Sequence, residues 1–158
     1  GGAIRKECIT ALTENGIPVL GHIGLLPQSI NNLGGFKVQG KTREAADALI
    51  DDATQLAAAG VFGIVLECVP PDIAALITAA VPVPIIGIGS GSACDGQVLV
   101  MNDLLGLSES PPAKFVKQYA SLAPQIKEAF AAYIKDVEAG TFPAPEHFYA
   151  AAQLKSHP

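Results

Sequence analysis

The sequence predicts a single α/β domain built on a parallel β-sheet with helical crossovers. Short apolar runs alternate along the chain with stretches whose apolar residues recur at helical spacing, and this alternation is typical of strand–helix units. The chain has 158 residues, which is the size of one domain. Hydrophobic residues make up 49% of it and charged residues 16%, so the composition excludes a disordered chain.

Four strands are predicted from apolar runs that are bounded by Gly, Pro or polar residues. The run at 61–66 is too apolar for a strand with one exposed face, which indicates burial on both faces. The last run ends at Asn102 and Asp103. The predicted strands are residues 17–23, 61–66, 84–89 and 98–101.

Helices are predicted between and after these strands. Asn15-Gly16 is a stop signal for the first, Thr42 is a capping residue for the second, and Pro71 suits the first turn of the third. Apolar residues from 115 to 137 step by threes and fours, and Pro124 divides them into two helical segments because proline suits a first turn. The helical stretches are 4–12, 42–57, 73–80 and 115–137, followed after Gly140 by an irregular tail at 141–158.

One connection is unusually long. Residues 25–41 are rich in glycine and lack periodicity, which is typical of either a functional ordered loop or a disordered segment. Gly34-Gly35 and Gly40 favour the ordered loop, and the disordered alternative stays open.

Charge and cysteine content exclude several classes of protein. Ten Lys and Arg residues against 15 Asp and Glu give a net charge of −5, which leaves no basic surface for nucleic acid or an anionic membrane. The apolar runs are shorter than the roughly 18 residues of a membrane span. The three cysteines lack metal-ligand spacing, and we expect Cys68 to be a reduced, buried thiol of a cytoplasmic protein.

Three polar residues follow apolar runs where parallel strands would end, and reactive groups collect at such ends. They are His22, Glu67 and Asp103. A carboxylate at the end of a buried strand is costly unless it is paired, hydrogen-bonded or protonated, so Glu67 is a candidate general base. The alternative is a structural ion pair with Arg or Lys.

His22 lies between Gly21 and Ile23, where small neighbours would let a substrate approach. A neutral imidazole there could donate to a developing oxyanion, or it could be a structural histidine satisfied by backbone groups. Residues 87–91, Gly-Ile-Gly-Ser-Gly, resemble a phosphate loop only weakly, since they lack its Lys-Ser/Thr. Close backbone packing explains these glycines better.

Six blocks stand out along the chain: GHIGLLPQS at 21–29, LGGFKVQG at 33–40, VLECVP at 65–70, IIGIG at 85–89, CDGQVLV at 94–100 and GTFP at 140–143. Taken together, these blocks resemble the ketopantoate hydroxymethyltransferase family. Ser90 stands where that family usually has Ala, a departure that is interpreted as tolerated drift. Asn102 stands where His often precedes Asp103, which argues against a side-chain role at that position.

The resemblance implies a (β/α)8 barrel that transfers a hydroxymethyl group from 5,10-methylenetetrahydrofolate to 3-methyl-2-oxobutanoate, giving ketopantoate for pantothenate synthesis. Glu67 would be the general base, His22 would position or polarise the substrate, and Mg²⁺ would hold its oxygens. The family also forms higher homo-oligomers.

The same comparison implies that residues 1–158 are the second half of one barrel domain, strands 5 to 8 with the C-terminal helices, since a whole barrel takes about 250 residues. The metal ligands would lie before Gly1. We therefore expect the chain to be inactive without the N-terminal half barrel. Two alternatives stay open: a non-catalytic half-barrel interaction module, and a related lyase or mutase acting on 2-oxo acids.

Overall fold

The computed structural model describes residues 1–29, 37–108 and 110–149. Within these ranges the chain divides into two compact units, which are described separately. The first comprises residues 1–100 with 113–116, and the second comprises 101–112 with 117–158. None of the helices in the described part of the chain has the length and apolar character needed to cross a bilayer.

The first unit is built on a parallel sheet, as the alternation of strands and helices predicts. Its strands are β1 (Leu20–Gly24), β2 (Gly63–Glu67), β3 (Ile85–Ile88) and β4 (Gly96–Gln97), in that order across the sheet. Each neighbouring pair is parallel. The first three predicted strands are confirmed to within a few residues.

The predicted fourth strand at 98–101 is wrong. The chain pairs two residues earlier, with Gly96 opposite Ile86 and Gln97 opposite Gly87. The amide of Val98 still donates to the carbonyl of Gly87 at 3.0 Å. Because β3 ends at Ile88, no further partners follow on that strand for the apolar run, and a helix begins at Met101.

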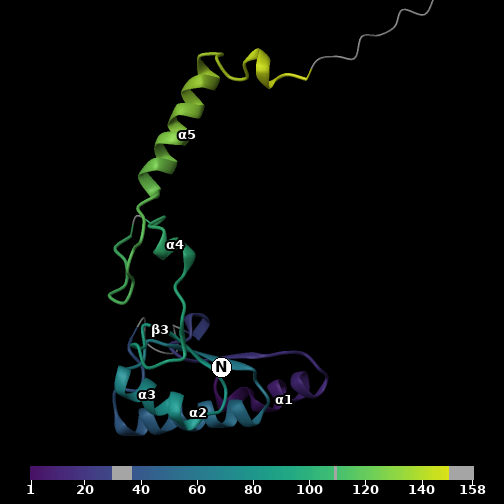
Figure 1. The fold of residues 1–158 in the computed structure, drawn as a ribbon, viewed down its shortest axis with the longest axis vertical. Helices are drawn as coiled ribbons and strands as arrows, with labels where there is room; N and C mark the ends of the chain where they lie inside the picture. Colours follow the sequence, from purple (N-terminus) through teal and green to yellow (C-terminus); the bar gives the residue numbers. More distant parts are fainter. Residues whose placement is uncertain (30–36, 109, 150–158) are drawn as a thin grey trace, which may run out of the picture. The chain divides into compact units, whose positions relative to one another are not determined.

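Helices cover one face of this sheet, with α2 and α3 side by side (Figure 1). They are α1 (Lys6–Glu14), α2 (Arg43–Ala58) and α3 (Pro71–Ala80), and a short 3-10 helix, η1 (Ala3–Arg5), precedes α1. The Thr42 hydroxyl accepts a hydrogen bond from the amide of Ala45 and so caps α2 as predicted. The buried core comprises Ile9, Ile23, Ala53, Leu56, Ala59, Val61, Ile64, Leu66, Val69, Ala74, Ile77, Val81 and Ile85.

The opposite face of the sheet is less buried. Register places His22 beside Val65 and Val65 beside Ile86, so these three share one face, and each is only partly buried. Leu20, two residues before His22, is 47% exposed. The sequence predicts that both faces of β2 are fully buried. In the structure one face of the sheet packs against the helices and the other is half-open.

The second unit holds α4 (Met101–Leu104), α5 (Ala123–Glu138) and a 3-10 helix, η3 (Pro145–His147). The predicted helix over 115–122 does not form, and α5 is the single helix of that stretch. Amides of Tyr119 and Leu122 instead donate to the carbonyls of Leu104 and Leu105. Those amides are then unavailable for helical bonds four residues back, so helix begins only at Ala123, with Pro124 in its first turn as predicted.

Two predicted segments fall partly outside the described residues. In the loop at 25–41 the structure gives η2 (Pro27–Ser29) and residues 37–41. The choice between an ordered and a disordered loop concerns mainly residues 30–36, which lie outside the described residues. Of the tail at 141–158, η3 is described and residues 150–158 are not.

Candidate active site

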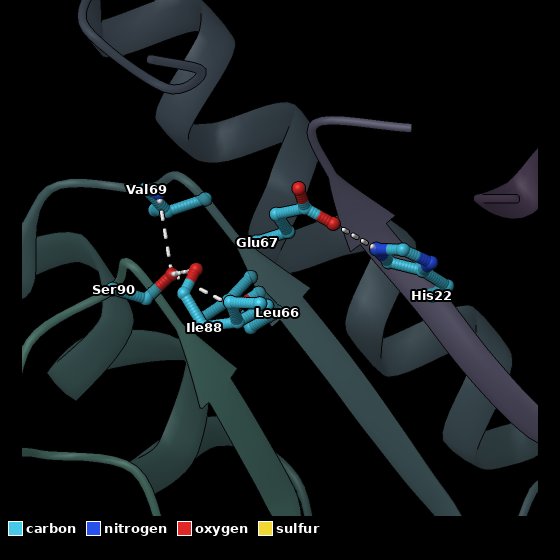
Figure 2. A network of polar contacts seen from close by, with 6 residues as sticks. All are labelled: His22, Leu66, Glu67, Val69, Ile88 and Ser90. Carbon is cyan, nitrogen blue, oxygen red and sulfur yellow. Dashed lines mark hydrogen bonds and ion pairs between the residues drawn. The ribbon is translucent and has the colours of Figure 1, made fainter. Parts of the chain in front are cut away.

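The structure brings two of the three predicted site residues together. His22 lies in β1 and Glu67 is the last residue of β2, and in the parallel pair Glu67 is opposite Gly24, two residues beyond His22. The His22 Nε2 and Glu67 Oε2 atoms are 3.1 Å apart. Figure 2 shows the Glu67 carboxylate reaching toward the imidazole from the neighbouring strand, with its second oxygen directed away from the ring.

Both side chains are partly shielded from solvent. Glu67 is 13% exposed and His22 is 29% exposed, which is enough access for a small ligand and little enough to strengthen the interaction between them. When Glu67 is ionised, the His22 Nε2 atom is the donor of this hydrogen bond. That leaves the second carboxylate oxygen free to accept a proton from another group.

Asp103 is placed differently from its prediction. It lies in α4, in the second unit, and is half-buried rather than standing at the end of a strand. The reason is the early pairing of β4, which ends at Gln97 and leaves Asp103 to the helix that follows.

The backbone beyond Glu67 is held in an unusual conformation. Cys68 has φ +53°, in the left-handed region that L-residues other than Asn and Asp rarely adopt. Its amide donates to the Ile88 carbonyl at 2.9 Å, and its carbonyl accepts from the Gln39 amide at 2.8 Å. These bonds offset the cost of the conformation and terminate β2 at the site.

The end of β1 packs against this turn. The Leu25 amide donates to the Glu67 carbonyl at 2.8 Å. Gly24 has φ +87°, and a Cβ atom there would collide with that carbonyl oxygen. A glycine is therefore required at 24 for the two strand ends to approach as closely as they do.

Cys68 itself is a free, half-buried thiol, more accessible than the buried one expected from its apolar neighbours. Burial first, and then the negative charge of Glu67, raise the pKa of the Cys68 thiol above its usual value. A thiol with a raised pKa is a poor nucleophile at neutral pH, which favours the interpretation of Cys68 as non-catalytic.

Sequence reasoning missed the contribution of Ser90. This residue is fully buried, and its Oγ donates to the Leu66 carbonyl at 2.8 Å and accepts from the Val69 amide at 3.3 Å. A Cβ atom at the adjacent Gly91 would lie 2.6 Å from Pro71 Cβ. Close packing therefore accounts for the Gly-Ile-Gly-Ser-Gly segment. The sequence feature that could have pointed to Ser90 is its hydroxyl, at a position where the family that the sequence resembles usually has Ala.

The site lacks a complete set of metal ligands within the described ranges. No group of three or more His, Cys, Asp or Glu side chains that could hold a metal ion occurs in residues 1–29, 37–108 or 110–149. Mg²⁺ prefers six oxygen ligands in near-octahedral geometry. Glu67 and His22 alone do not fit that requirement.

Comparison with known proteins shows which family this chain is similar to. Residues 1–145 match the family model described as "Ketopantoate hydroxymethyltransferase". A protein of Syntrophobacter fumaroxidans named 3-methyl-2-oxobutanoate hydroxymethyltransferase is 57% identical over 156 residues, which cover 99% of this chain and 55% of that protein. A protein of the same name from Clostridium novyi is 54% identical over 149 residues, 94% of this chain and 54% of the relative. The chain thus spans about half the length of the curated relatives it matches.

Proposed function

Because this chain belongs to the ketopantoate hydroxymethyltransferase family, we propose that it serves hydroxymethyl transfer from 5,10-methylenetetrahydrofolate to 3-methyl-2-oxobutanoate. The product is ketopantoate, on the route to pantothenate. The observation that carries the proposal is the contact of 3.1 Å between His22 and Glu67 at the carboxyl ends of two adjacent parallel strands. Such ends are where barrel enzymes of this class place their reacting groups.

Glu67 is the general base of this proposal. Its Oε2 atom is occupied by His22, so the other oxygen accepts the proton from C3 of the oxo acid, the carbon next to the keto group. The electron pair of the broken C–H bond delocalises onto the keto oxygen as an enolate. C3 then forms the new bond to the methylene carbon of 5,10-methylenetetrahydrofolate, whose two C–N bonds break so that tetrahydrofolate leaves. Water supplies the hydroxyl oxygen, and its two protons together with the one held by Glu67 end on the new hydroxyl and on the two folate nitrogens.

His22 orients the base and contributes to the charge balance of the site. A donor 3.1 Å from Oε2 fixes the carboxylate before substrate arrives, which avoids reorganisation during proton transfer. The contact supports the proposal over a rim ion pair with Arg or Lys, since the partner of Glu67 is the other residue predicted to be functional. Polarisation of the keto oxygen by the imidazole is a further role for His22.

Magnesium enters the proposal only through the family resemblance. The described residues do not provide its ligand set, so we propose that the ligands come from the part of the family that this chain does not span. When bound, the ion would hold the substrate oxygens and stabilise the enolate. The steps assigned to Glu67 and His22 do not depend on it.

We further propose that the four strands correspond to strands 5 to 8 of a (β/α)8 barrel. The chain covers 55% of a relative's length, and the face of the sheet that carries His22 and Glu67 is half-open. A polypeptide equivalent to the other half would cover this face and extend the sheet beyond β1. We propose a homo-oligomeric, cytoplasmic enzyme as the complete form.

The test is an assay of the chain alone and of the chain mixed with the N-terminal half of a close relative, each with Mg²⁺, 5,10-methylenetetrahydrofolate and 3-methyl-2-oxobutanoate. Ketopantoate formation by the mixture and not by either part supports the proposal. Turnover by the chain alone refutes the need for a second half. A mixture that associates and forms no ketopantoate refutes the transferase function.

Proton exchange at C3 of 3-methyl-2-oxobutanoate, followed in D₂O without folate, separates this function from the two alternatives. The proposed base catalyses that exchange. A lyase or mutase acting on other 2-oxo acids has no reason to catalyse it, and a non-catalytic interaction module catalyses neither exchange nor transfer.

A further inference from the structure

We propose that Ser90 is a positioning residue for Glu67: its buried hydroxyl holds the left-handed turn at Cys68 that aims the carboxylate at His22. The inference rests on the proposed function for its catalytic consequence, while its structural part stands on the contacts alone. Ser90 lies two residues beyond β3, and its hydrogen-bond partners are backbone groups of Leu66, Val69 and Ile88, not Glu67 or His22. It would therefore act through the backbone.

The hydroxyl joins the two sides of the turn. Ser90 Oγ donates to the carbonyl of Leu66, directly before Glu67, at 2.8 Å, and accepts from the amide of Val69, directly after Cys68, at 3.3 Å. Figure 2 shows these contacts beside the His22–Glu67 pair. The Ile88 carbonyl lies farther away, at 3.4 Å, so the single hydroxyl hydrogen is directed to Leu66.

The turn needs such a tie because of its conformation. Cys68 carries a side chain at φ +53°, which is unfavourable for an L-residue and relaxes unless its neighbours hold it. Ser90 is fully buried, so water does not replace its hydroxyl. Without that hydroxyl the Val69 amide and one lone pair of the Leu66 carbonyl lose a partner in the core, which is costly enough to shift the local backbone.

A shift there reaches the carboxylate directly. Glu67 lies between the two bonded residues, directly after Leu66 and two positions before Val69, and its contact with His22 spans only 3.1 Å. Misplacement of a catalytic group by about 1 Å costs up to about 10²-fold in rate. Because the family usually has Ala at this position, the turn does not collapse without the hydroxyl. For a partial relaxation of the turn in this chain we expect Ser90→Ala to lower kcat by at most about tenfold, with a change in KM for the oxo acid of less than about twofold, because substrate contacts are untouched.

The experiment compares Ser90→Ala, Cys68→Gly and their combination in the full chain. Glycine adopts positive φ without cost, so it should hold the turn without the hydroxyl. We expect Ser90→Ala to accelerate hydrogen exchange of the Val69 amide roughly tenfold and to move the ¹H–¹³C ring signals of His22 toward those of Glu67→Gln. Cys68→Gly in the Ser90→Ala background should return the His22 signals, and kcat of the complemented enzyme, toward those of the unmodified protein.

Thr13→Val is the matched control. The Thr13 hydroxyl also ties two segments, donating to the Ala59 carbonyl at 2.8 Å, but it lies where α2 ends, before the start of β2. Loss of the Thr13 hydroxyl should leave the His22 ring signals unchanged. Should Ser90→Ala fail to fold, Ser90→Cys replaces it, since a thiol keeps the volume and bonds more weakly.

Unchanged Val69 exchange and unchanged His22 signals in folded Ser90→Ala would overturn the inference. So would a lowered kcat that Cys68→Gly does not restore, because Ser90 would then act through packing and not through the turn. If the unmodified, complemented protein shows neither transfer nor proton exchange, the proposed function fails. The exchange and ring-signal measurements on the chain still decide whether Ser90 holds the turn.

Discussion

Replacement of Glu67 by Gln separates a catalytic carboxylate from a structural one. The amide has nearly the volume of the carboxylate and can still face His22 Nε2, 3.1 Å away, with its carbonyl oxygen. The structural loss is therefore at most one hydrogen bond on a side chain that is 13% exposed, or about 1 kcal/mol in the free energy of unfolding. The amide cannot accept a proton from carbon.

The expected loss in rate is much larger than that structural loss. Removing a general base costs about 10²-fold or more, and 10²-fold corresponds to about 2.7 kcal/mol in the activation barrier. The assay is the disappearance of the C3 proton signal of 3-methyl-2-oxobutanoate in D₂O, without folate, by the complemented protein. Urea unfolding followed by circular dichroism gives the stability of the same preparation.

Asp47→Asn is the control for loss of a carboxylate. Asp47 pairs with Arg43 at 3.0 Å on the surface of α2, where its side chain is 58% exposed, so its removal should change stability by less than about 0.5 kcal/mol and leave the exchange rate unchanged. A Glu67→Gln protein that keeps more than about a third of the exchange rate would refute the role of general base, since the expected factor is about 10². A loss of stability of several kcal/mol would instead identify Glu67 as structural.

Three further outcomes follow from the described contacts. Thr42→Ala removes the cap of α2, and we expect a loss of about 1 kcal/mol, measured by urea unfolding and absent in Thr42→Ser. Leu56→Ala opens a cavity at a fully buried position of α2 and should cost about 2–5 kcal/mol in the same measurement; an effect below about 1 kcal/mol would contradict the packing described. Cys68 should react with iodoacetamide more slowly than the exposed Cys8 at neutral pH. Burial and the charge of Glu67 raise the pKa of the Cys68 thiol, so its thiolate fraction stays low and its rate should keep rising as pH increases past the usual thiol range; equal rates in peptide mapping would contradict this.

Sequence signals within a short segment were sufficient to predict its structure where the determining interactions lie inside that segment. Thr42 caps α2, Pro124 lies in the first turn of α5, and the apolar run before Glu67 forms β2. In each case the determining interaction lies within a few residues along the chain. The same locality explains why Glu67 could be identified, since a carboxylate directly after a buried strand is unusual in the sequence alone.

Nonlocal pairing decided the elements that were predicted wrongly. Residues 98–101 have the composition of a strand, but the partners on β3 align with Gly96 and Gln97. The apolar period at 115–122 suits a helix, but the Tyr119 amide bonds to the Leu104 carbonyl. Neither competing partner is visible from the segment itself.

The amino-acid sequence by itself determined the class of fold, the helices that cover the sheet, and the identity of His22 and Glu67 as the residues of interest, because periodicity, capping and strand-end polarity are properties of short segments. Tertiary structure decided that these two side chains meet at 3.1 Å and that a buried hydroxyl at Ser90 spans the turn between Leu66 and Val69. Those distances depend on the register of three strands and on a left-handed residue at 68. Such features arise from the simultaneous packing of segments that lie more than 20 residues apart in the chain, with His22 and Glu67 separated by 45 residues and Val69 and Ser90 by 21.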